Sequence, residues 1–231
     1  MYEYDLVLID VGRFDKNLDI AEEYKVDPKA NGLPFLTILD ADGQVIANQE
    51  TGSLESKIEG KTEHDPISVL NFLSQNQAPY LDAESLLATA INQARKQNKM
   101  VFVHFGAPWC FWCHRFEDWM ADTEVTKIFA KNFVSVKIDV DRTLQGKVLH
   151  ERLTKGKEGG IPWFAVLDSQ GKTIADSYRM NGKNLGYPFT DQEIEVFTKL
   201  IKEVSKKIDA KDLGNLAKSL KARGKNAKAP K

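Results

Sequence analysis

The sequence is poor in cysteine and has no long apolar run. Its 231 residues include only two cysteines, Cys110 and Cys113, which excludes a framework of structural disulfides. No apolar stretch approaches the roughly 20 residues that a membrane-spanning helix needs. The start, M-Y-E-Y-D-L, lacks the basic and apolar regions of a signal peptide. We therefore expect neither a membrane span nor a signal peptide in this chain.

An excess of charge of one sign is missing too. The 32 basic and 33 acidic residues give a formal net charge of −1, so neither nucleic acid nor an anionic membrane is expected as a partner. Hydrophobic residues make up 42% of the chain and charged residues 28%, as in ordinary globular proteins. A chain of this length can form one or two domains, each with a sizeable hydrophobic core.

Both cysteines lie in one stretch, which reads V-F-V-H-F-G-A-P-W-C-F-W-C-H-R-F-E-D-W-M from Val101 to Met120. An apolar strand leads into it, and the cysteines stand at the head of an amphipathic helical pattern. Thiols three positions apart at a helix start are close enough to form a disulfide. Unpaired backbone N–H groups and the helix dipole stabilise a thiolate there. The pattern therefore predicts a redox dithiol.

The motif A-P-W-C-x-x-C after an apolar strand, with Gly160-Ile161-Pro162 about fifty residues later, resembles the thioredoxin superfamily. The resemblance covers roughly residues 80–207. It implies an α/β thioredoxin-like fold, with a central mixed sheet flanked by helices. It also implies a thiol–disulfide oxidoreductase that acts on protein or peptide disulfides and needs no cofactor. The C-F-W-C motif differs from the Gly-Pro of thioredoxins and the Gly-His of disulfide isomerases, so the redox direction and the recycling partner stay open.

The two thiols are expected to have different roles. Cys110 stands earliest on the helix and is expected to attack the substrate, as the resemblance also implies. Cys113, one turn further on, is expected to resolve the mixed disulfide. Pro162 resembles the cis-proline of the fold, which would let the backbone of Ile161 pair with an extended peptide. The alternative is a trans proline that starts a strand.

Three aromatic residues, Trp109, Phe111 and Trp112, surround the cysteines. They predict an apolar platform for an unfolded or peptide-like substrate. The alternative for Trp112 is packing against Phe116, which lies four residues further along the same helix.

His104 interrupts the apolar strand six residues before Cys110, where the thioredoxins that this stretch resembles carry a buried acid. Burial disfavours the charged form, so a neutral imidazole could accept the proton of Cys113 when that thiol attacks the mixed disulfide. The alternative is a core histidine that hydrogen-bonds to a backbone carbonyl.

Other functions compete with disulfide exchange. C-F-W-C-H fits the C-x-x-C-H pattern of covalent haem attachment, in which His114 would be the axial ligand. A non-catalytic thioredoxin-like binding or scaffold module is a second alternative. A zinc site is not expected, because Cys110, Cys113 and His114 give three ligands and nothing indicates a fourth.

The first 79 residues match the later part of the chain at a constant shift. Asp139 lies 129 positions after Asp10, and Pro162 lies 128 positions after Pro34. The match predicts an internal duplication. It divides the chain into a partial thioredoxin-like unit without cysteines (1–79), a complete domain (80–207), and a weak helix with a basic, disordered tail (208–231).

The first unit begins at a strand expected over residues 5–10, without the segment that carries the cysteines in the second. Either the chain is part of a longer protein with another such unit upstream, which we favour, or the N-terminal copy has decayed. A location outside the cytoplasm, in the bacterial periplasm, is favoured if the chain comes from a longer precursor. Otherwise a cytoplasmic location is expected.

Overall fold

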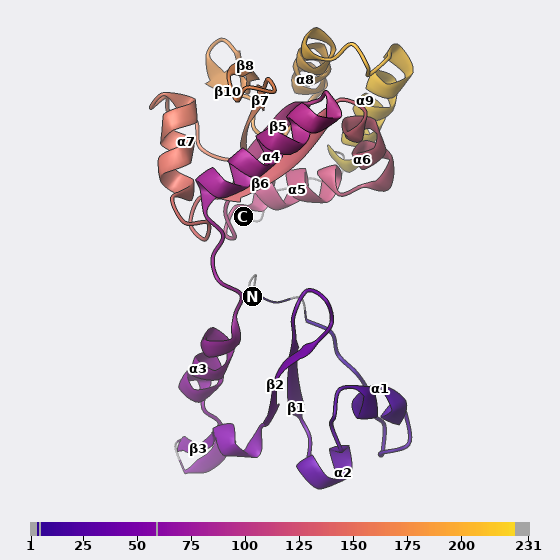
Figure 1. Ribbon diagram of the computed structural model, residues 1–231, viewed down its shortest axis with the longest axis vertical. Coiled ribbons are helices and arrows are strands. Elements are labelled where there is room, and N and C mark those ends of the chain that lie inside the picture. Colours follow the sequence, from indigo (N-terminus) through magenta and orange to yellow (C-terminus); the bar gives the residue numbers. More distant parts are fainter. Residues whose placement is uncertain (1–3, 5, 59, 225–231) are drawn as a thin grey trace. The chain divides into compact units, whose positions relative to one another are not determined.

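The computed structural model describes residue 4 and residues 6–58 and 60–224 (Figure 1). The predicted basic tail at 225–231 lies outside these residues. The chain divides into two compact units between Pro79 and Tyr80, and each unit is considered by itself. Over the described residues, no helix is both long enough and apolar enough to cross a membrane.

The second unit is built on a four-stranded mixed sheet in the order β6-β5-β7-β8. β5 runs parallel to β6 on one side and antiparallel to β7 on the other. The strands are β5 (Met100–Gly106), β6 (Phe133–Asp139), β7 (Trp163–Leu167) and β8 (Thr173–Asp176). A short hairpin of β9 (Tyr178–Met180) and β10 (Lys183–Asn184) follows.

Helices cover both faces of this sheet, because the side chains of each strand alternate between two apolar cores. One core lies under α4 (Ala83–Gln97) and α7 (Gly146–Thr154) and includes Val101, Val103 and Phe105. The other core includes Phe102 and lies under four helices. These are α5 (Phe111–Met120), α6 (Thr123–Ala130), α8 (Asp191–Val204) and α9 (Ala210–Gly224).

The sequence pattern predicts that Asp82 caps one helix and that Thr190 and Glu193 form the capping box of another, and both predictions are confirmed. The Asp82 carboxylate accepts a hydrogen bond from the Ser85 N–H at 2.8 Å and caps α4. Thr190 and Glu193 form the predicted capping box of α8. These local signals fix where α4 and α8 begin.

α9 extends the second unit beyond the boundary expected at Lys207. Leu216 and Leu220 are completely buried in the core, and Lys131 of the domain pairs with Asp212 of the helix at 2.6 Å. The leucines recur at helical spacing, so the helix is held by its apolar face. Its amphipathic pattern is therefore part of the fold.

The first unit has less regular structure and a small core. Only a few of its apolar side chains, among them Val11, Ala21, Ile38 and Leu54, are buried. Its elements are α1 (Leu18–Glu23), α2 (Pro28–Asn31), β1 (Phe35–Leu39), β2 (Val45–Glu50), a 3₁₀ turn (Gly52–Leu54), β3 (Glu55–Ile58), β4 (Lys61–His64) and α3 (Pro66–Asn76). β1 pairs with β2, and β3 pairs with β4. The β3–β4 hairpin had no clear sequence signal.

The strand expected at residues 5–10 is a wrong prediction for the part that the structure describes. Residues 6–10 form no regular structure, and the Leu8 side chain is 85% exposed. Within the described residues, no strand lies beside this segment to pair with it. An apolar sequence becomes a strand only where a neighbouring strand accepts its backbone hydrogen bonds.

Candidate active site

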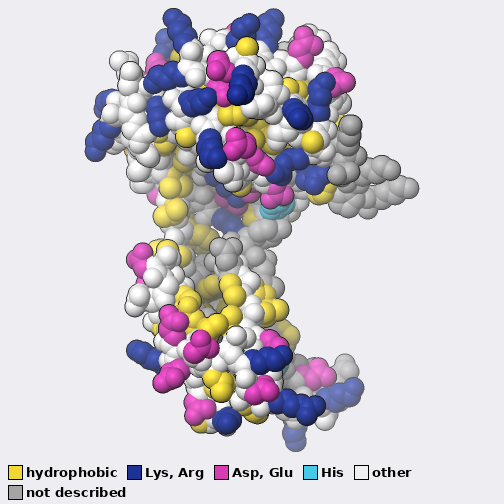
Figure 2. Space-filling model, turned by 90° about the vertical axis from the view of Figure 1, so that its right-hand side faces the viewer, with side chains coloured by type: hydrophobic (Ala, Val, Ile, Leu, Met, Phe, Trp, Pro, Cys, Tyr) yellow, Lys and Arg dark blue, Asp and Glu magenta, His cyan; other side chains and the backbone are white. Residues whose placement is uncertain are grey.

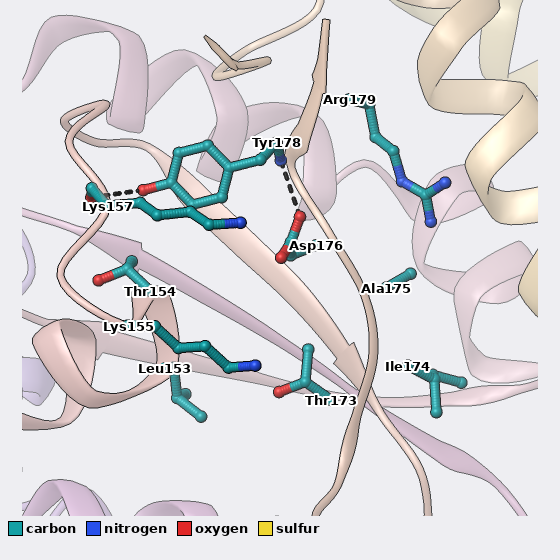
Figure 3. A pocket seen from close by; sticks show the side chains of 10 residues that line it. All are labelled: Leu153, Thr154, Lys155, Lys157, Thr173, Ile174, Ala175, Asp176, Tyr178 and Arg179. Carbon is teal, nitrogen blue, oxygen red and sulfur yellow. Dashed lines mark hydrogen bonds between the residues drawn. The ribbon is translucent and has the colours of Figure 1, made fainter. Parts of the chain in front are cut away.

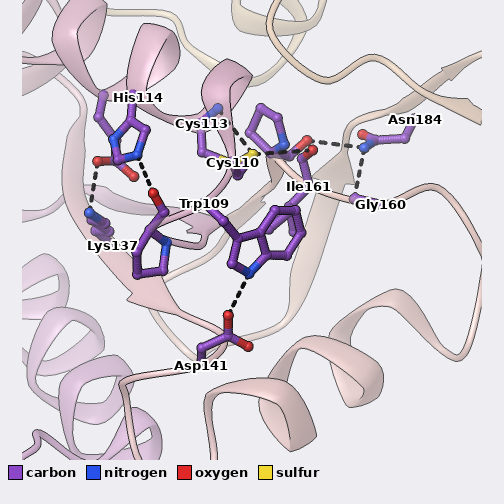
Figure 4. Close-up of a disulfide and its surroundings, with 12 residues drawn as sticks. Trp109, Cys110, Cys113, His114, Lys137, Asp141, Gly160, Ile161 and Asn184 are labelled. Carbon is purple, nitrogen blue, oxygen red and sulfur yellow. Dashed lines mark hydrogen bonds and ion pairs between the residues drawn. A yellow bond between two sulfur atoms is a disulfide. The ribbon is translucent and has the colours of Figure 1, made fainter. Parts of the chain in front are cut away.

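The two cysteines stand at the start of α5, where the chain turns after the central strand β5. Cys110 is the residue that caps the helix, and its Sγ accepts a hydrogen bond from the Cys113 N–H at 3.2 Å. The two side chains are joined as a disulfide, with Cα atoms 5.2 Å apart (Figure 4). A sulfur at this position lies beside the unpaired N–H groups of the first helical turn, as the sequence predicts.

Both cysteines are buried, but not equally. Cys110 is 6% exposed and Cys113 only 1% exposed, and both pack with Ala107, Val140 and Ile161. The first cysteine therefore lies nearer the surface, and the second is on the buried side of α5.

The G-I-P segment comes from the loop before β7 and lies against the first cysteine. The Ile161–Pro162 peptide bond is cis, and the Ile161 carbonyl oxygen is 3.7 Å from Cys110 Sγ. A reduced thiol at Cys110 could donate to this oxygen. The fold thus brings together two motifs that are 51 positions apart in the sequence.

Asn184, on β10, holds this loop in place and was not identified from the sequence. Its Nδ2 lies within 3.0 Å of the carbonyl oxygens of Gly159, Gly160 and Pro162 (Figure 4). Its Oδ1 accepts a hydrogen bond from the Ser177 hydroxyl at 2.6 Å. One amide side chain therefore fixes the backbone on both sides of Ile161.

Asn184→Ala is expected to loosen the loop without touching the thiols. Two of the three hydrogen bonds from Asn184 to the loop are exposed and the third is partly buried, so their loss costs about 0.5–1.5 kcal/mol of stability. We expect the free energy of unfolding in urea to fall by about that amount, and the amides of residues 159–161 to exchange faster. Lys183→Ala, at an exposed neighbour in the same strand, is the control. Equal exchange rates in both variants would show that Asn184 does not position the loop.

The three aromatic residues near the cysteines have different surroundings. Trp109 is 72% exposed, and its Nε1 donates to Asp141 at 2.7 Å. Phe111 is half-buried, and the Arg115 guanidinium lies 5.9 Å from its ring centre. Trp112 stacks on Phe189 with ring centres 5.0 Å apart and lies at the edge of the core. Trp109 is therefore the most accessible of the three.

His104 lies on the α5 side of β5, and its ring centre is 6.5 Å from that of Phe102 and 5.6 Å from that of Phe116. Its Nδ1 is buried and has no hydrogen-bond partner within the described part of the chain. Burial, together with the positive charge of Lys137 on the neighbouring strand, lowers the pKa of His104 to about 3. The imidazole is therefore neutral, as expected, but it is a weak base. Its role as proton acceptor stays a prediction.

Glu117 is a charged residue beside the dithiol that was not identified from the sequence. A β-carbon at Gly106 would lie 2.9 Å from Glu117 Oε1 and 3.6 Å from Cys113 Sγ, so both atoms border the same small space. The other carboxylate oxygen pairs with Lys137 Nζ at 2.7 Å. Glu117 follows Cys113 by four residues, which places both on one face of α5. That spacing is the signal that could have identified it.

His114 turns back toward the loop before the helix. Its Nε2 lies 2.7 Å from the Pro108 carbonyl oxygen (Figure 4). Across the described residues, no group of three or more His, Cys, Asp or Glu side chains is placed to hold a metal ion.

A cleft of about 350 Å³ lies elsewhere in the second unit, between the end of α7 and strands β8 and β9 (Figure 3). Lys155, Lys157 and Arg179 line it together with Asp176. Arg179 is paired with Glu203, which neutralises part of its charge. None of the residues predicted for the dithiol site lines this cleft.

Comparison with known proteins supports the assignment of the fold. Residues 82–169 match the model of a family described as thioredoxin-like. The thioredoxin-like fold predicted for the second unit is thus confirmed, and its sheet is mixed, as expected.

Individual relatives cover only part of the chain. It is 34% identical over 116 residues to spermatogenesis-associated protein 20 of Homo sapiens, covering 45% of this chain and 15% of that protein. A disulphide isomerase from Xylella fastidiosa Temecula1 is 24% identical, with a TM-score of 0.44, over 55% of this chain and 95% of that one. A thioredoxin from Thermus thermophilus is 20% identical, with a TM-score of 0.37, over 55% of this chain and 88% of that one.

Proposed function

We propose that this protein is a thiol–disulfide oxidoreductase that acts on protein disulfides through Cys110 and Cys113. The observation that carries the proposal is the disulfide at the start of α5, beside the Ile161 carbonyl. The two cysteines are the only ones in the chain, so their bond serves no wider structural framework. A thioredoxin-like fold is the setting in which such a pair exchanges disulfides with other proteins.

The proposed reaction in the reducing direction has two steps. The Cys110 thiolate attacks one sulfur of a substrate disulfide, which forms a mixed disulfide and releases the other substrate sulfur as a thiolate. The Cys113 thiolate then attacks Cys110 Sγ and releases the second substrate thiolate. Two electrons pass to the substrate, and the 110–113 disulfide is formed. A redox partner must reduce that bond before the next cycle, and an oxidase runs the same steps in reverse.

The substrate is proposed to bind as an extended segment across the mouth of the site. The backbone of Ile161 would pair with it, and Asn184 holds that backbone in position. Trp109, with most of its indole in contact with solvent, supplies apolar contact area. Phe111 and Trp112 would add contacts only along their exposed edges.

Covalent haem attachment is less well supported than disulfide exchange. It requires both sulfurs to form thioether bonds with an outside group, yet Cys113, on the buried side of α5, is only 1% exposed. His114, the expected axial ligand, is directed to the Pro108 carbonyl. A non-catalytic role for the dithiol predicts no turnover, so an activity assay separates it from the proposal.

The test is catalysed reduction of insulin by the full chain with dithiothreitol as the electron source. We expect the wild-type chain to shorten the lag before precipitation, and Cys110→Ser/Cys113→Ser to behave like the uncatalysed reaction. Equal lags for the two proteins would contradict the proposal. The reduction potential of the pair then gives the direction: about −270 mV is typical of a thioredoxin-type reductant, and about −120 mV of a strong oxidant.

A further inference from the structure

The last turn of α9 is tied to the helix that carries the dithiol. Leu216 and Leu220 of α9 are completely buried in the core that lies under α5. On the last turn, the Arg223 guanidinium donates to the Asp118 carbonyl oxygen at 3.2 Å and pairs with the Asp122 carboxylate at 3.1 Å. This turn is therefore fixed to the end of α5 and the start of α6.

Ion pairs connect α9 with its neighbours at both ends. Near its start, Asp212 pairs with Lys131 at 2.6 Å, and near its end Lys221 pairs with Asp191 of α8 at 2.7 Å. Figure 1 shows α9 beside α6 and α8, and Figure 2 views this side of the second unit, where Lys and Arg side chains lie next to Asp and Glu side chains. Surface pairs add little stability each, so the buried leucines hold the helix and the pairs mainly set its alignment.

The last turn of α9 is linked to Phe111, the first residue between the two cysteines. Arg115 donates through Nη2 to the Arg223 carbonyl oxygen at 3.4 Å. The last carbonyls of a helix lack partners within the helix and carry a partial negative charge, which favours a guanidinium there. The same guanidinium lies 5.9 Å from the centre of the Phe111 ring, within reach of a cation–π interaction. Arg115 therefore connects Phe111 to α9.

Trp112, the second residue between the cysteines, is linked to α9 through the loop before α8. Its ring stacks on Phe189 at an interplanar angle of 11°, and its centre is 6.1 Å from that of the Tyr187 ring. A β-carbon at Gly224 would lie 2.8 Å from the Phe189 carbonyl oxygen, so α9 ends directly against this residue. Both residues between the cysteines are thus held by contacts that lead to the same helix end.

The first turn of α5 is the part of the helix that acts on Cys110. The N–H of Cys113 lies 3.2 Å from Cys110 Sγ in the disulfide. After reduction, the N–H groups of this turn and the helix dipole stabilise the Cys110 thiolate. That stabilisation requires the N–H groups to stay directed at the sulfur, so it depends on how firmly Phe111 and Trp112 are held.

We propose that the last turn of α9 positions the dithiol, with Arg223 acting through Arg115 and Phe111, and Phe189 acting through Trp112. The two residues keep the first turn of α5 directed at Cys110 and so increase the fraction of Cys110 that is thiolate. This inference rests on the proposed disulfide exchange, because the thiolate is the form that attacks. Stabilising the reduced form also makes a dithiol pair more oxidising, so the same contacts raise the reduction potential.

The rate of Cys110 alkylation by iodoacetamide, measured from pH 5 to 10, tests the proposal. The parent protein is the reduced full chain with Cys113→Ser, in which Cys110 is the only thiol. Only the thiolate reacts, so the midpoint of the profile gives the pKa of Cys110. We expect Arg223→Ala to lower the ionisation constant about three-fold, the size of an effect at a helix terminus. Phe189→Leu, which keeps an apolar side chain but removes the stacked ring, should shift the pKa upward in the same way.

Two variants serve as matched controls. Asp212→Asn breaks the ion pair with Lys131 at the other end of α9 and leaves the contacts of the last turn intact. Phe189→Tyr keeps a ring that can stack on Trp112. We expect both to retain the Cys110 pKa of the parent protein. Urea unfolding of each variant separates a local effect on the thiol from a general loss of stability.

Two results would overturn the proposal. One is an unchanged Cys110 pKa in the folded Arg223→Ala and Phe189→Leu proteins. The other is an equal shift in Asp212→Asn, which would make the general stability of α9 the cause. A shift in only one variant supports the contacts of that residue and overturns those of the other. If Arg223→Ala does not fold, Phe189→Leu decides, because the Phe189 side chain is 38% exposed and lies outside the core.

The failure of this proposal and the failure of the proposed function are distinguishable. Alkylation needs no disulfide substrate, so the Cys110 pKa is measured whether or not the chain reduces insulin. A chain without insulin reduction that still shows the pKa shift in Arg223→Ala would contradict the proposed function alone. An active chain whose Cys110 pKa is the same in all variants would contradict the positioning role alone.

Discussion

Replacing Cys110 with serine is expected to reduce disulfide exchange to the uncatalysed rate, whereas Cys113→Ser should accumulate mixed disulfides with substrate. Cys110 caps α5 and is the more exposed of the two cysteines, so it is the thiol that an incoming disulfide can reach. Cys113 is 1% exposed and can reach only the sulfur of Cys110. Without it, the first step proceeds and the second cannot.

Mass spectrometry under non-reducing conditions measures the trapped complex directly. The Cys113→Ser protein should carry one substrate chain per molecule, released by dithiothreitol, and Cys110→Ser should carry none. Ala107→Ser, which adds a hydroxyl to the same buried cluster without removing a thiol, is the control. Normal turnover by Cys113→Ser, together with slower alkylation of Cys110 than of Cys113 in the reduced protein, would reverse the assignment.

The parts of the fold that local sequence determines were predictable. Asp82, Thr190 and Asp65 mark helix starts because each side chain caps backbone N–H groups within its own first turn. β5 and the start of α5 were predictable for the same reason, since the apolar run and the C-x-x-C motif are contiguous. The spacing of the cysteines permits the disulfide that the structure contains, but the C-x-x-C-H pattern alone also fits haem attachment.

The remaining parts depend on neighbours that are distant in sequence. Residues 6–10 have the composition of a strand, but no described strand pairs with them. Asn184 stands in a polar stretch, and only the folded hairpin brings its amide to the loop before β7. In the sequence, Glu117 is an ordinary charged residue on a helix. Only the structure shows that Gly106, which has no side chain, leaves space beside its carboxylate. Such residues acquire their roles from tertiary contacts that single-sequence patterns do not contain.

His104, predicted from the sequence, and Glu117 are the two candidate proton acceptors for Cys113, and a physical argument distinguishes them. Transfer of the Cys113 proton to the neutral imidazole would create two opposite charges in the core. Transfer to a carboxylate moves one negative charge and creates none, and Lys137 is already paired with Glu117. Separating charge in a buried site is costly, so the carboxylate is the better acceptor.

Glu117→Gln is therefore expected to slow the second step, in which Cys113 releases the substrate. Two effects oppose each other in this variant. Loss of a positioned proton acceptor costs about 10²-fold or more in rate. Removal of a nearby negative charge makes the Cys113 thiolate easier to form, by about ten-fold for a shift of one pKa unit. The net expectation is a rate lower by about ten-fold at neutral pH, with the deficit closing as the pH rises and hydroxide removes the proton.

Stopped-flow release from a preformed Cys110 mixed disulfide, measured from pH 5 to 9, tests this expectation. His104→Gln is the matched comparison, since it removes the other candidate from the same side of β5. Because the pKa of His104 is held at about 3, its own titration contributes no bend to the profile in this range. If the release rate of His104→Gln depends on pH as that of the wild type does, and the release rate of Glu117→Gln does not, the carboxylate is the group that accepts the proton. The opposite pattern would assign it to His104, and two unchanged profiles would leave both residues without a part in the step.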